Sequence, residues 1–259
     1  MARNLRQLNS INPLNPYFAP PGLPDSRRLA ATFILHNSLV LDTTLNPDFS
    51  QVGIDNPAVP NQRFPPYFAE VRPFFIENSS YFITPISLYY TNNIVKPQFG
   101  ARLTGKLGPW ALGILGVDDR SPGQSVPPGD PQFNSRAHYY VGRLNRDLGS
   151  SSNAGIIYAD REYKDSFNRA GGVDYRFRLR NRWTVTGQGV TSETRNLSNS
   201  TAGEQYCENY ALSCSGQAWM QELSYTDLHW NWWTAYSDTS AGFVTDTGFF
   251  QRPDIREPS

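Results

Sequence analysis

Two groups of charged side chains in this sequence could fasten a segment or hold a ligand. In the first group, Glu70, Arg72 and Glu77 flank the pair Phe74 and Phe75. Opposite charges this close in sequence can form ion pairs and hydrogen bonds, and phenylalanine rings bury large apolar areas. We predict that the charged residues tie their segment to a wall while the two rings wedge against apolar surface. A ligand-contacting role remains open, because charged side chains that line a passage can select solutes.

The second group is basic and falls on one face of two segments in which polar and apolar residues alternate: Arg102, Lys106, Arg176, Arg178 and Arg180. A track of cations of this kind could attract anions. The alternative is that these side chains pair with Asp42, Asp147 and Asp174, which we expect on the same face. We favour pairing, since closed sheets of moderate size fill their interiors with side chains.

Residues for catalysis are few. His36, His138 and His229 are the three histidines, and each lies in a segment that we predict to be a strand. No recognisable motif supplies a serine or cysteine nucleophile. His138 with Ser135, or His229 with Ser224, would be the pairs to examine for a hydrolase built into a membrane wall. We expect a protein that is not an enzyme and that uses no metal and no cofactor.

The two cysteines, Cys207 and Cys214, lie close together in a polar stretch. Their spacing suits a small disulfide-closed loop better than a zinc site, because no other ligands lie nearby. Two unpaired thiols are the alternative. A disulfide would favour an oxidising compartment outside the cytoplasm.

Composition narrows the classes of protein that can position these residues. The 23 Lys and Arg residues balance the 23 Asp and Glu residues, so no net positive field recruits phosphates and we expect no nucleic acid as partner. Aromatic residues make up 14% of the chain, and Gly and Pro contribute 20 each, which favours strands and turns over long helices. The longest nearly apolar run, residues 109–117, is far shorter than the ~20 residues of a membrane-spanning helix.

From Gln98 onward the chain breaks into segments whose apolar and polar residues alternate. In residues 172–180, for example, Val173 and Phe177 face one way while Asp174 and Arg176 face the other. A period of two residues is typical of a strand with two different faces. A β-sandwich in water and a membrane β-barrel both produce this pattern. We favour the barrel, because many strands end in Tyr or Trp and many apolar positions hold Gly or Ala, which are too small for a dense sandwich core.

We predict eleven strands: 29–36, 38–45, 98–107, 109–118, 136–148, 153–163, 171–180, 182–192, 217–226, 228–236 and 242–250. Tight connections alternate with longer ones, as in outer-membrane barrels, and the longest is an excursion at residues 46–97 that folds over or into the barrel like a plug. Residues 1–28 form an N-terminal extended segment before a barrel domain at 29–259. An odd number of strands implies that the chain is part of a larger barrel, or that residues 1–28 supply another strand.

Two blocks of the excursion resemble a known family. They are TLNPDFSQVGIDNPAV at residues 44–59 and RFPPYFAEVRPFFIENSSYF at residues 63–82. Both are similar to blocks of an uncharacterised bacterial outer-membrane β-barrel family, a domain of unknown function whose long members place a family-9-like carbohydrate-binding module before the barrel. The matching residues are Asn46, Pro47, Asp48, Phe49, Gln51, Val52, Asp55, Phe64, Phe68, Glu70, Arg72, Pro73, Phe74, Phe75 and Glu77. Later segments, among them 139–148 and 243–256, look like strands of the same family.

The chain departs from the family pattern at Gly53, Ile54, Val71 and Asn78, and we find no segment like the carbohydrate-binding module. A sugar-binding role inherited from that module is therefore not supported. Asp48, in the first matching block, is a candidate binding residue, or it caps a turn by bonding its own backbone.

The resemblance implies an antiparallel transmembrane β-barrel in a bacterial outer membrane, with membrane lipid as partner. We expect a non-enzymatic pore or surface scaffold. The alternatives are an assembly subunit whose external loops bind protein or polysaccharide, and a membrane-embedded hydrolase. The solute and the oligomeric state are left open by the sequence.

Overall fold

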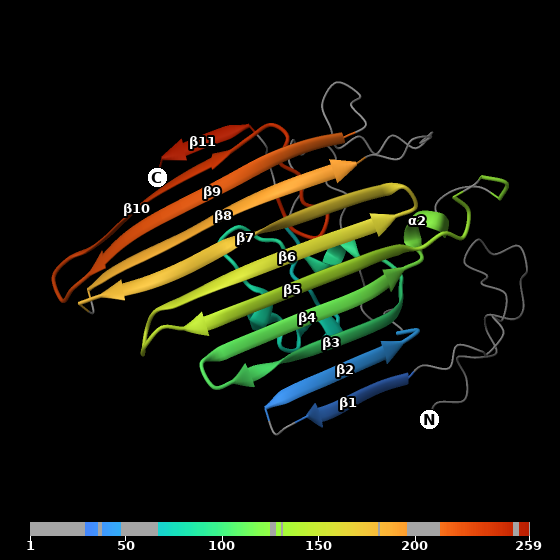
Figure 1. The fold of residues 1–259 in the computed structure, drawn as a ribbon, viewed down its shortest axis with the longest axis horizontal. Helices are drawn as coiled ribbons and strands as arrows, with labels where there is room; N and C mark the ends of the chain where they lie inside the picture. The colour runs from blue at the N-terminus through green and yellow to red at the C-terminus, as the bar shows by residue number, and fades with distance from the viewer. Residues whose placement is uncertain are drawn as a thin grey trace, which may run out of the picture.

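The computed structural model describes residues 29–35, 38–47, 67–124, 128–130, 132–180, 182–195, 213–250 and 254–258. In this part of the chain, eleven antiparallel strands form one sheet, and each strand pairs with its neighbours in sequence (Figure 1). The strands are β1 (Leu29–Leu35), β2 (Leu39–Leu45), β3 (Pro97–Leu107), β4 (Trp110–Asp119), β5 (Ala137–Asp147), β6 (Asn153–Tyr163), β7 (Ser166–Leu179), β8 (Trp183–Arg195), β9 (Ser213–Thr226), β10 (Asn231–Thr239) and β11 (Ile255–Pro258).

The helical elements of the described residues are short. They are α1 (Pro73–Ile76), α2 (Ser121–Gln124) and the 3-10 turns η1 (Ser79–Phe82) and η2 (Thr91–Asn93). In the described ranges, no helix has both the length and the apolar character needed to cross a bilayer.

The sheet is open at both sides. Its strands follow one another in order from β1 to β11, and no pairing joins these two edge strands within the described residues. β11 is short and covers only Tyr236–Thr239 of β10, which leaves the remainder of that strand's edge without a partner there. The predicted all-β, antiparallel class is thus confirmed, whereas the predicted closure into a barrel is not found among these strands.

The predicted strands from 29–36 to 228–236 are all present, with ends that differ by a few residues. The predicted connection at 164–170 is much shorter than expected, because β7 already begins at Ser166. Lys164 makes this possible by adopting a left-handed backbone with a φ of 57°. Such a conformation lets a chain reverse within very few residues.

The predicted strand at 242–250 is wrong. Residues 240–250, which we call the strap, run irregularly along the inner face of the sheet and bury Phe243 and Thr247. Ser240 N still donates to the Gln217 carbonyl oxygen of β9 at 2.9 Å. Further along, Val244 N donates to the side chain of Ser192 (Oγ) at 3.1 Å, and the Thr247 carbonyl accepts from Tyr90 N at 2.7 Å. Side chains of the strap are therefore buried in alternation although its backbone does not pair as a strand.

The two faces of the sheet have opposite character. Large apolar side chains stand exposed on the outer face, among them Phe99, Ile114, Ile156, Val173 and Trp219. The inner face buries polar and charged side chains, among them Arg102, Arg143, Asn168, Asp174 and Gln188. In a protein surrounded by water, apolar groups bury and charges face outward. This sheet instead exposes apolar groups on its outer face, while its inner face buries charged and polar side chains together with apolar residues of the core.

Aromatic rings also cover small residues on the outer face. Tyr175 crosses Gly187 on the neighbouring strand and donates a hydrogen bond to Gln221 Oε1 at 2.5 Å. A Cβ at position 187 would lie 2.6 Å from the Tyr175 hydroxyl oxygen, so only glycine leaves room for the ring. The many glycines at outward positions thus let rings lie flat on the sheet.

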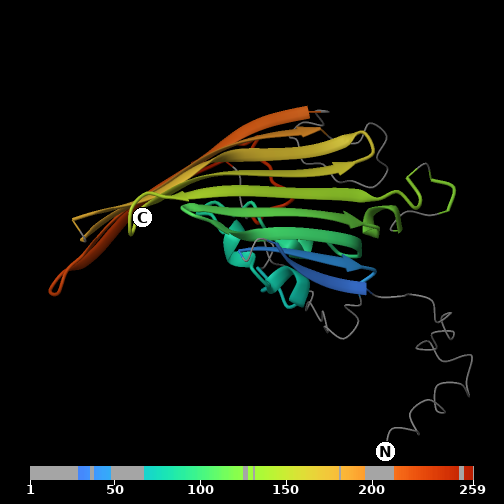
Figure 2. The same cartoon turned by 60° about the horizontal axis from the view of Figure 1, so that its bottom comes forward.

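The described part of the excursion, residues 67–96, lies under the concave face of the sheet and is called the inner segment below (Figure 2). Its Phe75, Phe82 and Leu88 are buried together with Leu115 and Val117 of β4. The hydrophobic core of this part of the chain therefore sits between the inner segment and the sheet.

Candidate functional site

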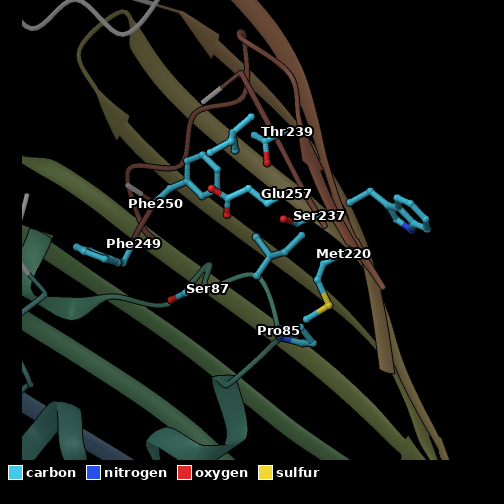
Figure 3. Close-up of a pocket in the computed structure, with 11 residues that line it drawn as sticks. Pro85, Ser87, Met220, Ser237, Thr239, Phe249, Phe250 and Glu257 are labelled. Carbon is cyan, nitrogen blue, oxygen red and sulfur yellow. The ribbon is translucent and has the colours of Figure 1, made fainter. Parts of the chain in front are cut away.

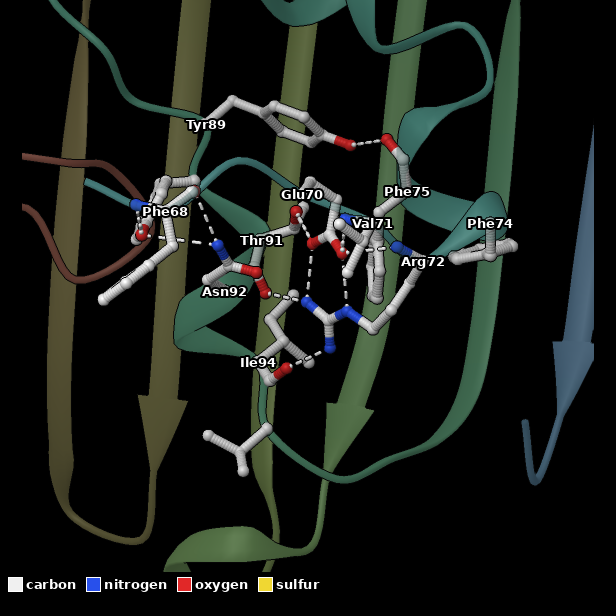
Figure 4. A network of polar contacts seen from close by, with 12 residues as sticks. Phe68, Glu70, Val71, Arg72, Phe74, Phe75, Tyr89, Thr91, Asn92 and Ile94 are labelled. Carbon is white, nitrogen blue, oxygen red and sulfur yellow. Dashed lines mark hydrogen bonds and ion pairs between the residues drawn. The ribbon is translucent and has the colours of Figure 1, made fainter. Parts of the chain in front are cut away.

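A buried pair of charges holds the two ends of the inner segment together (Figure 4). Arg72, whose side chain is 2% exposed, donates from Nε to Glu70 Oε1 at 2.8 Å and from Nη2 to Glu70 Oε2 at 2.7 Å. The same guanidinium donates to the carbonyl oxygens of Thr91 and Ile94, each at 2.6 Å. Residues about twenty positions apart are thereby joined through one side chain.

Glu70 is held in its charged form. Burial alone would raise the pKa of its carboxyl, but hydrogen bonds from Arg72 and Thr91 and the positive charge of Arg72 outweigh burial and leave the pKa below its ordinary value. The Thr91 hydroxyl and the backbone N–H groups of Val71 and Arg72 all donate to this carboxylate. A charge with this many donors stabilises the loop around it.

The structure divides the predicted group of three charged residues. Glu70 and Arg72 join two parts of the inner segment to each other, whereas we predicted that they tie the segment to the wall. Glu77 does face the wall, with its Oε2 3.6 Å from Nη2 of Arg102 on β3. The Glu77 side chain is 65% exposed, so this contact is a weak one.

Arg102 is the main wall residue that receives the inner segment. Its side chain is fully buried and donates from Nη2 to Asp42 Oδ2 of β2 at 2.6 Å, while Nη1 donates to the Phe74 carbonyl oxygen. Thr32 of β1 donates to the other oxygen of Asp42 at 2.7 Å. A chain of polar contacts therefore runs from the edge strand through the wall to α1.

The two phenylalanines pack as a wedge in different ways. Phe74 lies against Gly100 of β3, where a Cβ would stand 2.9 Å from the ring. Phe75 is buried, and the Arg72 guanidinium lies 4.4 Å from its ring centroid. The predicted wedge is therefore present, and part of its surface is a cation–π contact.

Two wall residues that we did not predict to contact the inner segment hold its far side. Asp119, at the end of β4, accepts hydrogen bonds from the backbone N–H groups of Val95 and Lys96, each at 2.8 Å. Gln188 of β8 accepts from Ile86 N at 2.5 Å. The one sequence signal for Asp119 is that it is a polar residue close to the strand at which the excursion ends. Nothing in the sequence pointed to Gln188 as a partner of the inner segment.

The strap adds a third attachment. Asn93 Nδ2 donates to the carbonyl oxygens of Asp246 and Gly248 at 2.7 and 3.0 Å, and Arg161 of β6 forms an ion pair with Asp246 at 3.3 Å. Asn168 of β7 donates to the Val244 carbonyl at 3.0 Å. The inner segment is thus held between the sheet and the strap.

Two residues of the predicted basic track form ion pairs with acids that we expected on the same face. Arg102 pairs with Asp42 as described, and Lys106 pairs with Asp147. Asp174, however, is bound by Arg143 of β5, whose two terminal nitrogens lie 2.7 and 3.0 Å from its oxygens. Arg143 was not singled out from the sequence.

The other three residues of the predicted track lie on β7 and in the turn after it. Arg176 and Arg178 are exposed near the end of β7, and Arg180 is exposed in the turn that follows. The short connections after β3, β7 and β9 define the end of the sheet that we call the tight-turn end. These three exposed cations therefore lie at or near that end.

Cavities remain beside the sheet, and the first two described below adjoin the inner segment. One of about 610 Å³ lies between residues 80–85 and the walls of β3 to β8. A second, of about 460 Å³, lies between residues 85–87, the end of the strap and β9 to β11; Met220, Thr239 and Glu257 line it (Figure 3). A third, of about 820 Å³, lies along β8 to β11. The inner segment thus fills its side of the sheet incompletely.

The candidate hydrolase pairs are not brought together. His138 is exposed on the outer face of β5, whereas His229 lies in the turn before β10 and not in a strand as predicted. No hydrogen bond links His138 to Ser135 or His229 to Ser224, all of which are described residues. His36 lies outside the described residues. In the described ranges, no group of three or more His, Cys, Asp or Glu side chains could hold a metal ion.

Three further predicted residues are Asp48, Cys207 and Cys214, and the structure describes the last of them. Asp48 lies outside the part of the chain that the structure describes, as does Cys207. Cys214 lies near the start of β9 and is disulfide-bonded. Its pairing with Cys207 stays a prediction.

Comparison with known proteins gives one match. A family described as "Domain of unknown function (DUF5916)" matches residues 32–100, which include β2, the inner segment and the first residues of β3. No curated protein and no solved structure matches the chain. The match supports an uncharacterised domain family over the residues that contain the Glu70–Arg72 pair; it does not show the outer-membrane setting or the carbohydrate-binding neighbour that the resemblance implies.

Proposed function

We propose that this chain forms wall and plug of a transmembrane β-barrel in a bacterial outer membrane, where it acts as a solute pore or surface scaffold and not as an enzyme. In this proposal the acyl chains of lipids cover the outer face, and the inner segment and the strap occupy the lumen. Further strands, supplied beyond the open edges of the sheet, complete the ring.

The reversed polarity of the two faces is the observation that carries the proposal. Exposed apolar residues such as Ile156 and Val173 lie on the outer face of the same strands whose inner face buries the Arg143–Asp174 pair. Contiguous exposed apolar surface is uncommon in monomeric proteins of aqueous compartments and marks contact with a membrane or a partner. A membrane barrel requires apolar residues outside and polar residues inside.

Strand length supports the same reading. β3, β5 and β6 each contain 11 residues and β4 contains 10, while a tilted transmembrane strand needs ~9–11. The longer β7 to β9 would project beyond the hydrocarbon, as their tight-turn ends project past the inner segment in Figure 2.

Aromatic side chains gather where a membrane interface would lie. On the outer face near the tight-turn end, the ring of Trp183 lies 4.9 Å from that of Tyr225 and 5.4 Å from that of Trp232. Trp110 stands on the same side with Arg146 5.1 Å above its ring. Amphipathic rings and basic groups are enriched at this level in barrels, where one part contacts lipid and the other contacts water.

Conductance in planar bilayers tests the pore against the scaffold. A pore gives discrete current steps, and loosening the plug by Arg72→Ala should raise their size or frequency. A sealed scaffold gives no steps in the wild-type protein even when flotation with lipid vesicles and a shift in gel migration on boiling show that it is folded in the bilayer. Failure to associate with vesicles at all would contradict both forms of the proposal.

A second candidate is an assembly subunit, and the open edges of the sheet favour it. Unpaired edges template the addition of strands from another chain. Residues 29–35 offer one such edge, and the part of β10 that β11 leaves uncovered offers the other within the described strands. A native mass well above that of one 29.2 kDa chain in detergent would support it, whereas a monomeric mass would count against it.

A further inference from the structure

The cavity of about 610 Å³ is a polar chamber with defined walls. Its roof is the part of the inner segment that carries Ser80, Thr84 and Pro85, and its walls come from the six strands β3 to β8. Wall side chains with hydrogen-bonding groups include Lys106, Arg143, Asn145, Asn153, Asp174, Arg176 and Thr186. The chamber is large enough for a small organic solute. Arg178, later on β7, and Arg180, in the turn after it, continue the line of cations from Arg176 toward the tight-turn end.

The charges around this chamber do not cancel. Lys106, Arg143 and Arg176 line it against a single lining carboxylate, Asp174. Arg143 takes up Asp174 with two hydrogen bonds. Lys106 forms an ion pair with Asp147. An ammonium group has three hydrogen-bond donors, and this contact uses one of them. One positive charge is left over even when Asp147 is counted.

Arg176 carries the surplus charge. It stands between Asn153 of β6 and Thr186 of β8, both uncharged and both on the inner face. Arg176 forms no ion pair within the described residues, and the nearest acid on its own strand, Asp174, is occupied by Arg143. A guanidinium offers five donors in a planar fork that matches carboxylate and phosphate oxygens.

The chamber also contains an unused neutral group. The Oδ1 atom of Asn145 is buried and has no hydrogen-bond partner among the described residues. Asn145 pairs across the ladder with Gly155, and a Cβ at position 155 would lie 3.2 Å from this oxygen and 3.3 Å from an oxygen of Asp174. A buried acceptor without a partner costs free energy, and a donor such as a hydroxyl group of a bound molecule would satisfy it.

We propose that this chamber binds a small anion that carries more than one carboxylate or phosphate group, with Arg176 and Lys106 as its cationic contacts. Asn145 Oδ1 would accept from a hydroxyl group where the anion carries one. The inference goes beyond the proposed pore or scaffold role, since binding requires only the chamber. A neutral solute would leave the surplus positive charge of the chamber without a partner, and a cation would be repelled by it. Size limits the occupant to a small metabolite-like molecule.

Isothermal titration calorimetry on the full chain in a non-ionic detergent at low salt tests this proposal, with citrate and pyrophosphate as separate probes and glucose as the neutral comparison. We expect one or both anions to bind and glucose not to bind. Arg176→Gln should weaken binding about tenfold or more, because it removes a charge-assisted contact. Lys106→Met should weaken it less. Whether citrate or pyrophosphate binds more tightly distinguishes a carboxylate from a phosphate ligand.

Arg136→Gln is the matched control, since Arg136 pairs with Asp118 on the outer face and does not line the chamber. Its affinity should equal that of the wild-type protein. The proposal is overturned if neither anion binds the wild-type chain, if Arg176→Gln binds as tightly as wild type, or if Arg136→Gln loses as much affinity as Arg176→Gln. None of these outcomes depends on whether the protein conducts ions, so the test is separate from that of the proposed function.

Discussion

Phe74 of the inner segment and Gly100 of β3 fit together so closely that a Cβ at position 100 would lie 2.9 Å from Cε1 of the ring. The ring therefore occupies the space that a side chain at position 100 would fill. Beside it, Arg102 donates to the carbonyl oxygen of Phe74 itself. Shape and hydrogen bonding thus place α1 at one position on the wall.

Gly100→Ala should loosen the inner segment. The new methyl group would overlap the Phe74 ring and the Thr44 methyl group, and overpacking of this kind costs ~1–3 kcal/mol. Gly142→Ala is the control, because nothing lies within 4 Å of a Cβ at that position. We expect limited proteolysis to cut the inner segment faster in Gly100→Ala than in Gly142→Ala; equal rates would show that the Phe74 contact does not position the segment.

Asp42→Asn should destabilise the sheet strongly. It leaves Arg102 fully buried without its carboxylate, and removal of one partner of a buried ion pair costs ~3–5 kcal/mol. Asp147→Asn breaks the Lys106 pair, in which both side chains are 40% or more exposed, and should cost ~1 kcal/mol or less. Denaturant unfolding in detergent gives both free energies of unfolding. Similar values for the two variants would mean that Arg102 finds another partner or water.

Acid should release the ends of the inner segment from one another. The pKa of Glu70 in the folded protein lies below its value in the unfolded chain, so the stability that its contacts provide is present above the ordinary pKa and is lost as the pH falls through the folded pKa. Hydrogen-exchange protection factors of Val71 and Arg72, whose N–H groups donate to Glu70, should drop across that range.

Glu70→Gln should remove this acid dependence, since its amide does not titrate. Asp227→Asn is a matched control: the pKa of Asp227 is also lowered, first by the hydrogen bond from Leu228 N–H, but this residue lies in the turn after β9. The drop in protection at Val71 should survive in Asp227→Asn. A Glu70→Gln protein that still loses protection in acid would assign the effect to another group.

A charge on the outer face should be far more costly than the same charge on the inner face. Ile156→Arg places a cation on the outer face of β6, where we propose lipid, and a cation near the middle of a bilayer costs ~2–4 kcal/mol in barrels. Asn153→Arg puts the same side chain on the inner face of that strand. Urea titration of folding into vesicles should show a large loss for the first variant and little for the second. Equal losses would contradict the assignment of the two faces.

Much of the sheet could be predicted because a period of two residues is a local property. Val173 and Asp174 alternate in the sequence and do face opposite sides of β7. The same rule produced the error at 242–250, where extended backbone buries alternate side chains without pairing as a strand. Alternation in the sequence indicates which side chains are buried. It cannot distinguish a strand paired in a sheet from a strap whose backbone is bound by the side chains of Ser192 and Asn168.

The contacts of the inner segment were harder to predict because they join residues far apart in sequence. The bond from Ile86 N to Gln188 links positions 102 residues apart. The partner of Asp174 was also missed, since the register that places Arg143 of β5 within reach, across β6, is set by pairing and not by composition. Glu70 and Arg72, two residues apart, were grouped from the sequence because their contact is local.

The central claim is that lipid covers the outer face, and quenching of Trp219 tests it most directly. Trp219 stands on that face of β9 with 47% of its surface exposed, and the other tryptophans, five of the chain's six, can be replaced by Phe. In vesicles whose acyl chains carry bromine atoms, its fluorescence should be strongly quenched relative to unbrominated vesicles. Equal emission in the two kinds of vesicle, with the protein recovered in the aqueous phase, would contradict the account.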